Sequence, residues 1–327
     1  MLLWRYACPS VILRRFKAMR YASSRRCWPL PGSKVNNQMT RTLALELAPF
    51  RFLVESDIPF VYENIRRLYG SAVSDCLDKP DYYVSVKKAE GIRSFYRPQA
   101  RFFADQQEPF QPLQQQQAYA MLEWGMNWCI ATHEMQHVII HAAVLAKDNK
   151  AILFPAPPGS GKSTLTTWLA FHGWRLLSDE MALIQPFSRT VLPFVRPICL
   201  KNNSITLAKS WFPDATFSTI ASDTHKGDVI HLSPPEDSWQ QSSTPAEIIG
   251  VVFPNFRADQ ALQVYQLNKT ESFMQLAQNA FNYGVIGDDG FSTLCQLIEQ
   301  VPGFEIFYQD LAEVDAFLQQ ELIDATD

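Results

Sequence analysis

Short apolar runs and a single helical segment characterise the first third of the chain. Strands are predicted near residues 43–52, 82–87 and 93–96, where apolar residues alternate with polar ones or cluster in short runs. A helix is predicted over residues 59–69. Together these elements favour a small α+β domain over residues 39–112.

A glutamine-rich stretch follows this domain. Residues 106–117 also contain proline, which is typical of a surface connector. The helix expected next, over residues 115–132, places Leu122, Met126 and Cys129 on one face at helical spacing. We interpret that face as core packing.

The hydrophobic pattern changes character after this helix. Residues 138–145 and 151–154 are short, apolar and rich in bulky side chains, which predicts two buried strands. A Gly/Pro turn, a helix over residues 162–172 and strands over 175–177 and 181–184 follow. This order of strand, loop, helix and strand is typical of open α/β nucleotide-binding cores.

The remaining sequence alternates loops, near 186–197 and 234–245, with further short elements. The expected elements are strands near residues 248–253, 262–267 and 304–308, helices near 271–281 and 291–300, and a last helix from Leu311. Residues 113–327 are therefore predicted to form one α/β domain.

Composition agrees with a soluble protein of two domains. The chain has 327 residues, of which 47% are hydrophobic and 19% charged, enough for two hydrophobic cores. A net charge of −4 and a pI near 5.9 favour neither nucleic acid nor an anionic membrane as a partner. The six cysteines form no CxxC pair, as expected for reduced thiols. We expect a cytoplasmic protein without a membrane span.

Residues 1–38 differ from the rest because they contain Arg and Lys but no Asp or Glu. Such a start is found in organellar transit peptides, in disordered tails and in over-extended reading frames, here with Met39 as the true start. We favour the last two interpretations.

The clearest motif is a glycine-rich loop at residues 156–164, between a predicted strand and a predicted helix. In this context a P-loop directs backbone N–H groups and the positive end of a helix at phosphate oxygens. Lys162 would reach the β- and γ-phosphates of ATP and Ser163 would bind Mg²⁺. Ala156 stands where the strict pattern has glycine. The expected nucleotide-binding residues are Pro158, Gly159, Ser160, Gly161, Lys162, Ser163 and Thr164.

Two adjacent acids, Asp179 and Glu180, end the strand that follows the P-loop helix. At the carboxyl edge of a parallel sheet they would face the same crevice as the P-loop. One acid can then lie beside the metal while the other accepts a proton from an attacking hydroxyl. His141, on the strand before the P-loop strand, is either a core residue or a third member of this site.

The segment from His133 to His137 matches the HExxH pattern of zinc proteases, and His141 would be a third ligand. That chemistry requires both histidines on one helical face. The predicted helix ends near residue 132 and a strand begins at 138, so the histidines should straddle a turn. We therefore prefer the P-loop interpretation.

In order and spacing, these residues resemble the HPr kinase/phosphorylase catalytic domain, and more closely the HPr-kinase-related proteins labelled HPr kinase-related kinase A. The resemblance rests on His141, the P-loop at 158–164 and the acidic pair that ends 173–180. Further stretches similar to the related-kinase subgroup are residues 123–129, 196–202, 226–235 and 281–283.

The resemblance implies a fold similar to phosphoenolpyruvate carboxykinase around the P-loop, and transfer of phosphate from ATP to a hydroxyl. It makes Asp179 the catalytic base, Glu180 a metal-side acid, and His141 a residue that orients the acids or the phosphate. This sequence departs from HPr kinases at Glu180, where they have a second aspartate, and around Arg196, where their glycine-rich signature is absent. Neither a phosphorylase activity nor HPr as the substrate is implied.

We thus expect a kinase with ATP and Mg²⁺ as cofactors, catalytic residues Asp179, His141 and Lys162, and metal ligands Ser163 and Glu180. The acceptor would be a hydroxyl on a protein serine or a small molecule, with Lys201 and Lys226 as candidate contacts. The resemblance also suggests a homo-oligomer. Alternatives are an ATP-binding regulatory or assembly module without an acceptor, and a plain ATPase.

Overall fold

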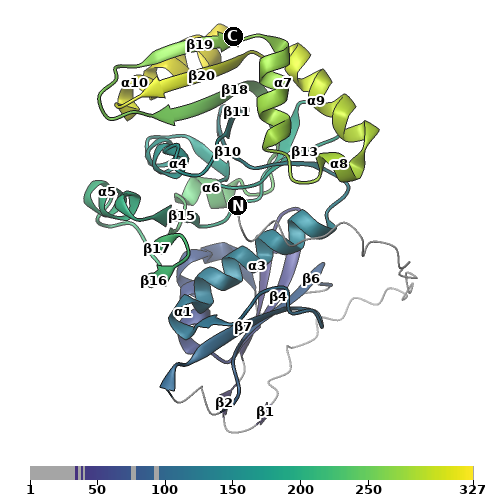
Figure 1. Cartoon of the computed structure of the whole chain (residues 1–327), viewed down its shortest axis with the longest axis vertical. Helices are drawn as coiled ribbons and strands as arrows, with labels where there is room; N and C mark the ends of the chain where they lie inside the picture. Colours follow the sequence, from purple (N-terminus) through teal and green to yellow (C-terminus); the bar gives the residue numbers. More distant parts are fainter. Residues whose placement is uncertain (1–33, 36–37, 40, 75–78, 92–95, 327) are drawn as a thin grey trace.

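The computed structural model describes residues 34–35, 38–39, 41–74, 79–91 and 96–326. It is a mixed α/β structure in which a smaller N-terminal unit lies beneath a larger sheet-and-helix unit (Figure 1). The predictions for residues 93–95 and nearly all of 1–38 fall outside the described residues, apart from the short strands β1 (Lys34–Val35) and β2 (Gln38–Met39).

A six-stranded sheet forms the N-terminal unit, in the order β5-β3-β4-β6-β7-β8. Its strands are β3 (Arg41–Leu47), β4 (Phe50–Ser56), β5 (Val73–Ser74), β6 (Tyr82–Lys88), β7 (Gln99–Ala104) and β8 (Leu113–Gln114). The prediction of one strand over 43–52 is wrong, because the chain reverses at the cis Ala48–Pro49 bond and makes the β3–β4 hairpin. Proline lacks the N–H that a continuous strand needs here.

Helices α1 (Pro59–Leu68) and α3 (Ala118–His133) cover this sheet, with the short 3₁₀ turns η3 (Gly70–Ala72) and η4 (Gln115–Gln117) beside them. Both helices lie where the sequence predicts them. Gly125 permits a close approach, since a Cβ there would meet the Phe102 ring at 2.1 Å. Although α3 lies beyond the boundary expected at residue 112, it packs into the N-terminal core.

The larger unit contains a nine-stranded mixed sheet, whose main path runs β12-β10-β11-β18-β14-β13-β9. Its strands are β9 (Val138–Ile140), β10 (Ala142–Lys147), β11 (Lys150–Pro155), β12 (Arg175–Ser178), β13 (Ala182–Ile184), β14 (Thr190–Leu192), β18 (Ala246–Phe256), β19 (Gln263–Leu267) and β20 (Gly303–Tyr308). β18 is parallel to both β11 and β20, and the other pairs are antiparallel.

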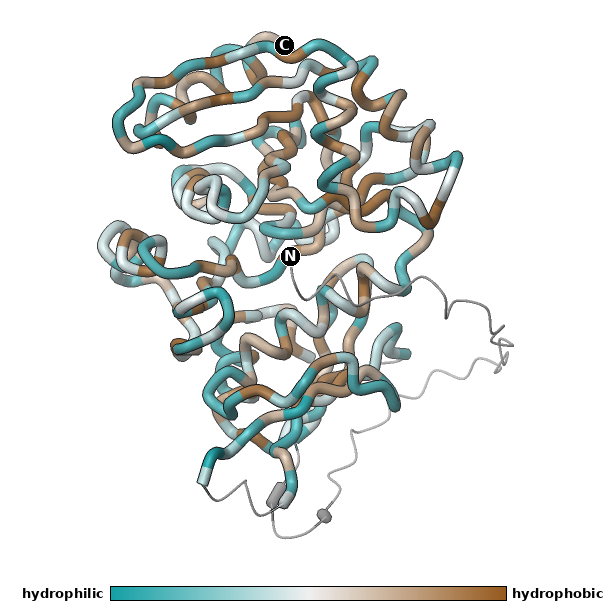
Figure 2. The backbone as a smooth tube through the Cα atoms, in the orientation of Figure 1, coloured by the Kyte–Doolittle hydropathy of each residue, from teal (hydrophilic) through white to brown (hydrophobic). Residues whose placement is uncertain are grey.

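Helices cover both faces of this sheet. Along β11 the side chains alternate, so that Ile152 and Phe154 pack on one face and Ala151 and Leu153 on the other. The helices are α4 (Lys162–Phe171) and α10 (Leu311–Leu318) on the first face, and α7 (Lys269–Gln278), α8 (Tyr283–Ile286) and α9 (Asp288–Gln300) on the second. The turns η5 (Gln319–Ile323) and η6 (Asp324–Thr326) end the chain. Figure 2 shows the hydrophobic segments in the interior and hydrophilic outer loops.

A separate three-stranded sheet, in the order β15-β17-β16, lies between the two units (Figure 1). It comprises β15 (Ile198–Lys201), β16 (Ala221–Thr224) and β17 (Gly227–Leu232), with α5 (Asn203–Trp211) and α6 (Glu236–Gln240) nearby. This sheet is not predicted by the sequence pattern. The prediction of loops over residues 186–197 and 234–245 is also wrong at β14 and α6.

The single strand expected over residues 138–145 is also wrong. The chain breaks at His141, whose backbone N–H donates to Asn279 O at 2.7 Å, so that β9 and β10 lie at distant positions of the same sheet. Throughout the described ranges, we find no helix whose length and hydrophobicity would let it cross a membrane.

Candidate active site

The P-loop and the acidic pair emerge at the same edge of the sheet, although their strands do not pair. β11 and β12 are both antiparallel to β10, which lies between them, so both point the same way. The P-loop follows the end of β11 and Asp179 follows the end of β12. The prediction that the P-loop and the acids share one edge of the sheet is confirmed. The sheet is mixed, however, and β11 and β12 do not pair with each other.

The P-loop adopts a tight backbone turn before the first turn of α4. Gly159 and Gly161 have φ of +90° and +88°, a region that side chains with a Cβ rarely adopt. Pro158 is exposed at the tip, Ser160 is buried, and Ser163 and Thr164 lie partly exposed on the first turn of α4. Free backbone N–H groups at a helix start can receive an anion.

Gly161 is also required by packing. A Cβ at this position would lie 2.8 Å from Phe256 Cβ and 2.9 Å from the Tyr308 hydroxyl, whereas a Cβ at Gly159 would meet nothing within 4 Å. Gly161→Ala should lower the free energy of unfolding by roughly 1–3 kcal/mol through strain and overlap. Gly159→Ala is the matched control, because it carries the backbone strain alone. Urea unfolding measures both, and equal stabilities would show that Phe256 and Tyr308 do not constrain the loop.

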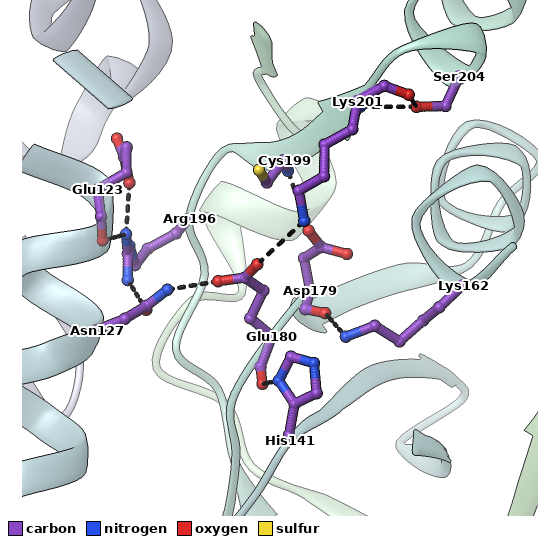
Figure 3. A network of polar contacts seen from close by, with 10 residues as sticks. All are labelled: Glu123, Asn127, His141, Lys162, Asp179, Glu180, Arg196, Cys199, Lys201 and Ser204. Carbon is purple, nitrogen blue, oxygen red and sulfur yellow. Dashed lines mark hydrogen bonds and ion pairs between the residues drawn. The ribbon is translucent and has the colours of Figure 1, made fainter. Parts of the chain in front are cut away.

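Lys162 connects the P-loop to the acidic pair. Its side chain is buried, and Nζ donates a hydrogen bond of 2.9 Å to the backbone carbonyl of Asp179 (Figure 3). Burial lowers the pKa of Lys162, and the nearby charge of Asp179 opposes that shift. The ammonium group is therefore held beside the acids by a hydrogen bond to a neutral carbonyl.

Asp179 has one oxygen engaged and one oxygen unpaired. Its side chain is only 5% exposed, and Oδ2 accepts a hydrogen bond of 2.9 Å from the backbone N–H of Cys199. Oδ1 is buried and has no hydrogen-bond partner in the described part of the chain. Burial raises the pKa of Asp179, against the attraction of Lys162. A carboxylate with a raised pKa and a free oxygen is a suitable proton acceptor.

Glu180 faces positive and polar groups. Its Oε1 lies 3.9 Å from Lys201 Nζ, and Asn127 Nδ2 donates a short hydrogen bond to Oε2. Burial alone would raise the pKa of Glu180, but the charge of Lys201, together with that of Lys162, lowers it well below its usual range. Glu180 is therefore ionised at neutral pH.

His141 contacts the backbone of the pair. Its Nδ1 lies 3.2 Å from the carbonyl oxygen of Glu180, and its ring packs edge-on against Phe281. The charge of Lys162, followed by burial, lowers the pKa of His141 to about 3. Since a carbonyl only accepts, the neutral ring must carry its proton on Nδ1 and donate it. His141 thus supports Glu180 and is not a cation in this site.

A buried polar network, absent from the sequence-based site, joins Glu180 to the N-terminal unit. Arg196 pairs with Glu123 and donates to Asn127 Oδ1 (Figure 3). The Tyr69 hydroxyl donates to Glu123 Oε1 at 2.8 Å. Arg196 and Glu123 are 8% and 2% exposed. The signal that could have identified Glu123 and Asn127 is their spacing of four in an otherwise apolar helix, which places both on one face.

The HExxH segment does not lie on one helical face. α3 ends at His133, and Glu134 is already extended, as the predicted turn requires. Nδ1 of His133 contacts Cys129 O at 2.9 Å, while Nδ1 of His137 contacts Glu134 Oε1 at 3.1 Å. Within the described ranges, no three His, Cys, Asp or Glu side chains form a group that could hold a metal.

Mg²⁺ delivered with a nucleotide requires less than such a cluster. It is typically held by one or two protein oxygens together with phosphates and water. The donors here, an ionised carboxylate at Glu180 and the partly exposed hydroxyl of Ser163, have the hard-oxygen chemistry that this ion prefers. The residues present therefore fit Mg²⁺, and Glu180 and Ser163 would hold it.

A cavity of about 20 Å³ lies between α3 and the acids, lined among others by Trp124, Asn127, Asp179, Glu180 and Cys199. It has room for about one water-sized group. An atom entering it reaches both acids. The combination of an anion-receiving loop, a buried lysine and an unpaired carboxylate oxygen can place a phosphate beside a proton acceptor.

Comparison with known proteins adds no assignment. No protein-family model matches this sequence, and no curated protein matches it significantly.

Proposed function

We propose that this protein is an ATP-dependent kinase that transfers the γ-phosphate to a hydroxyl group. The observation that carries the proposal is the Lys162 hydrogen bond to the Asp179 carbonyl, which joins the P-loop to an acid with one unpaired buried oxygen. The fold would then be a P-loop kinase core of the HPr kinase and phosphoenolpyruvate carboxykinase type. The resemblance in residue order and spacing supports this finer assignment.

In the proposed reaction the P-loop N–H groups and Lys162 hold the nucleotide phosphates. The acceptor oxygen forms a bond to the γ-phosphorus as the bond to the ADP oxygen breaks, and the hydroxyl proton passes to Asp179 Oδ1. Bound Mg²⁺ would neutralise phosphate charge. His141 and Asn127 hold Glu180 in place through its carbonyl and its carboxylate. Positioning and fixed charge supply most of the rate enhancement.

Label transfer from γ-labelled ATP tests the proposal. We expect label to appear in an acceptor when the protein is incubated with small hydroxyl compounds and lysate proteins, and to be lost in Lys162→Ala. ADP release that needs no acceptor indicates a plain ATPase, in which Asp179 positions water. Nucleotide binding without label transfer or hydrolysis favours a regulatory or assembly module. Either outcome contradicts the kinase.

A further inference from the structure

Two lysines of the three-stranded sheet lie around the candidate site: Lys201 Nζ lies 3.9 Å from Glu180 Oε1, and Lys226 Nζ lies over Trp124, which lines the cavity beside the acids. Lys201 ends β15, and Lys226 lies in the two-residue turn between β16 and β17. Thr224 Oγ1 accepts from Lys226 N at 3.0 Å, which closes the turn. Asn202 Nδ2 donates to the Lys226 carbonyl at 3.3 Å and lies against Gly227, which ties the turn to β15.

Lys226 has no acidic partner in the described part of the chain, but its side chain is positioned by an aromatic ring. Its Nζ lies 5.5 Å above the Trp124 ring, and the neighbouring His225 packs edge-on against the same ring. Trp124 lines the small cavity beside Asp179 and Glu180, and its indole N–H is buried without a hydrogen-bond partner in the described ranges. A lysine held on an aromatic ring beside an unused N–H donor is suited to an anionic oxygen.

This position lies across the acids from the P-loop. Lys162 approaches Asp179 from α4, whereas Glu123 and Asn127 approach from α3 on the opposite side (Figure 3). Trp124 follows Glu123 on α3, so Lys226 stands on the α3 side. The nucleotide phosphates are served by Lys162 and the loop, which leaves Lys226 to a second ligand.

Among the described residues, the local charges leave Lys226 without a matching acid. Arg196 is matched by Glu123. Lys201 shares Glu180 with Asn127, and Glu180 is expected to face Mg²⁺ when the nucleotide is bound. Lys226 therefore keeps a positive charge without a matching acid, and an anionic ligand placed beside it would be attracted to that charge.

We infer that the acceptor is a small hydroxyl compound that also carries a carboxylate or phosphate group, bound by Lys226 and Lys201 with the Trp124 N–H. This inference rests on the proposed kinase function. A small molecule is favoured over a protein loop because Asp179 is only 5% exposed behind a cavity of about 20 Å³. The anionic group would anchor the compound on the α3 side while its hydroxyl meets Asp179.

Anion binding with the P-loop filled tests the inference independently of turnover. The protein is saturated with Mg²⁺ and a non-hydrolysable ATP analogue, and D-glycerate, glycerol 3-phosphate and glycerol are titrated by calorimetry. We expect the two anions to bind and glycerol to bind at least tenfold more weakly. Lys226→Met should weaken both anions by about tenfold or more, through loss of a charge-assisted contact. Lys226→Arg should retain most of the affinity.

Lys209→Met is the matched control, because Lys209 lies on α5 with its Nζ over the Phe217 ring, away from the acids. It should leave anion binding unchanged. Equal anion affinity in the native protein and Lys226→Met, or equal binding of glycerol and glycerate, overturns the inference. Circular dichroism confirms that each variant is folded.

Two outcomes separate this inference from the kinase proposal. If the anions bind through Lys226 but no label leaves γ-labelled ATP for any acceptor, the anion site stands and the kinase fails. If label enters a neutral compound or a peptide serine equally in the native protein and Lys226→Met, the kinase stands and the anionic acceptor is excluded.

Discussion

Replacing Asp179 by Asn should lower turnover by about 10²–10⁴-fold while nucleotide affinity changes little. Asn has nearly the same shape, and its carbonyl can still accept the hydrogen bond that Cys199 N donates at 2.9 Å. It cannot take a proton from an attacking hydroxyl. The unpaired Oδ1 of the native residue, buried beside the cavity, is the atom whose chemistry is removed.

Nucleotide affinity is expected to persist because Lys162 contacts the backbone carbonyl of Asp179 and not its carboxylate. Single-turnover transfer from γ-labelled ATP measures the chemical step, and titration with a fluorescent ATP analogue measures affinity. Asp214→Asn, an exposed acid on the loop after α5, makes the same chemical change away from the site and should leave both unchanged. An Asp179→Asn protein with native turnover would remove Asp179 from the mechanism.

The elements around the P-loop could be predicted because their signals are local. About 20 consecutive residues contain a short apolar strand, two glycines that need positive φ and a helix that starts at Lys162. The acids at the end of β12 follow from the same reasoning. Strand pairing was not predictable in this way, because β10 separates β11 from β12 and only long-range contacts decide that order.

The three-stranded sheet was missed because its strands are short and β16 is largely polar. β16 (Ala221–Thr224) has the sequence ASDT, which no alternation rule reads as a strand. Its pairing with β17 is closed by a turn, and Gln117 Nε2 from outside the sheet donates to the carbonyls of Ser222 and Asp223. The candidate site predicted from the sequence therefore included the P-loop, the acids and His141. It did not include the position of the lysines or the contacts made by α3.

The network from α3 could not be inferred from the sequence because its members are far apart. Arg196 lies 73 residues after Glu123 in the sequence, and only folding brings the two side chains together. Isolated polar residues in an apolar helix must find partners when they are buried. That rule identifies Glu123 and Asn127 as residues with a buried partner, but it does not identify the partner.

Replacing Arg196 by Met should lower the free energy of unfolding by about 3–5 kcal/mol, because it leaves the Glu123 carboxylate buried without its cation. Burial on its own would lower the pKa of Arg196, but the charge of Glu123 outweighs it and raises that pKa above its usual range. Asn127 also loses a contact, which should loosen its hydrogen bond to Glu180. Urea unfolding followed by circular dichroism measures the change.

The double variant Glu123→Met/Arg196→Met separates stability from positioning. Two apolar side chains of similar volume should recover most of the lost free energy, since no buried charge remains unpaired. Asn127 still lacks the Arg196 donor, so label transfer should stay low although the fold is stable. Arg189→Met is the matched control: it breaks an Arg–Glu pair whose side chains are 36% and 56% exposed and should cost no more than about 1 kcal/mol. If Arg196→Met is as stable as Arg189→Met, apolar packing alone holds α3 against the site. If the double variant regains full label transfer, Asn127 does not need Arg196 to hold Glu180.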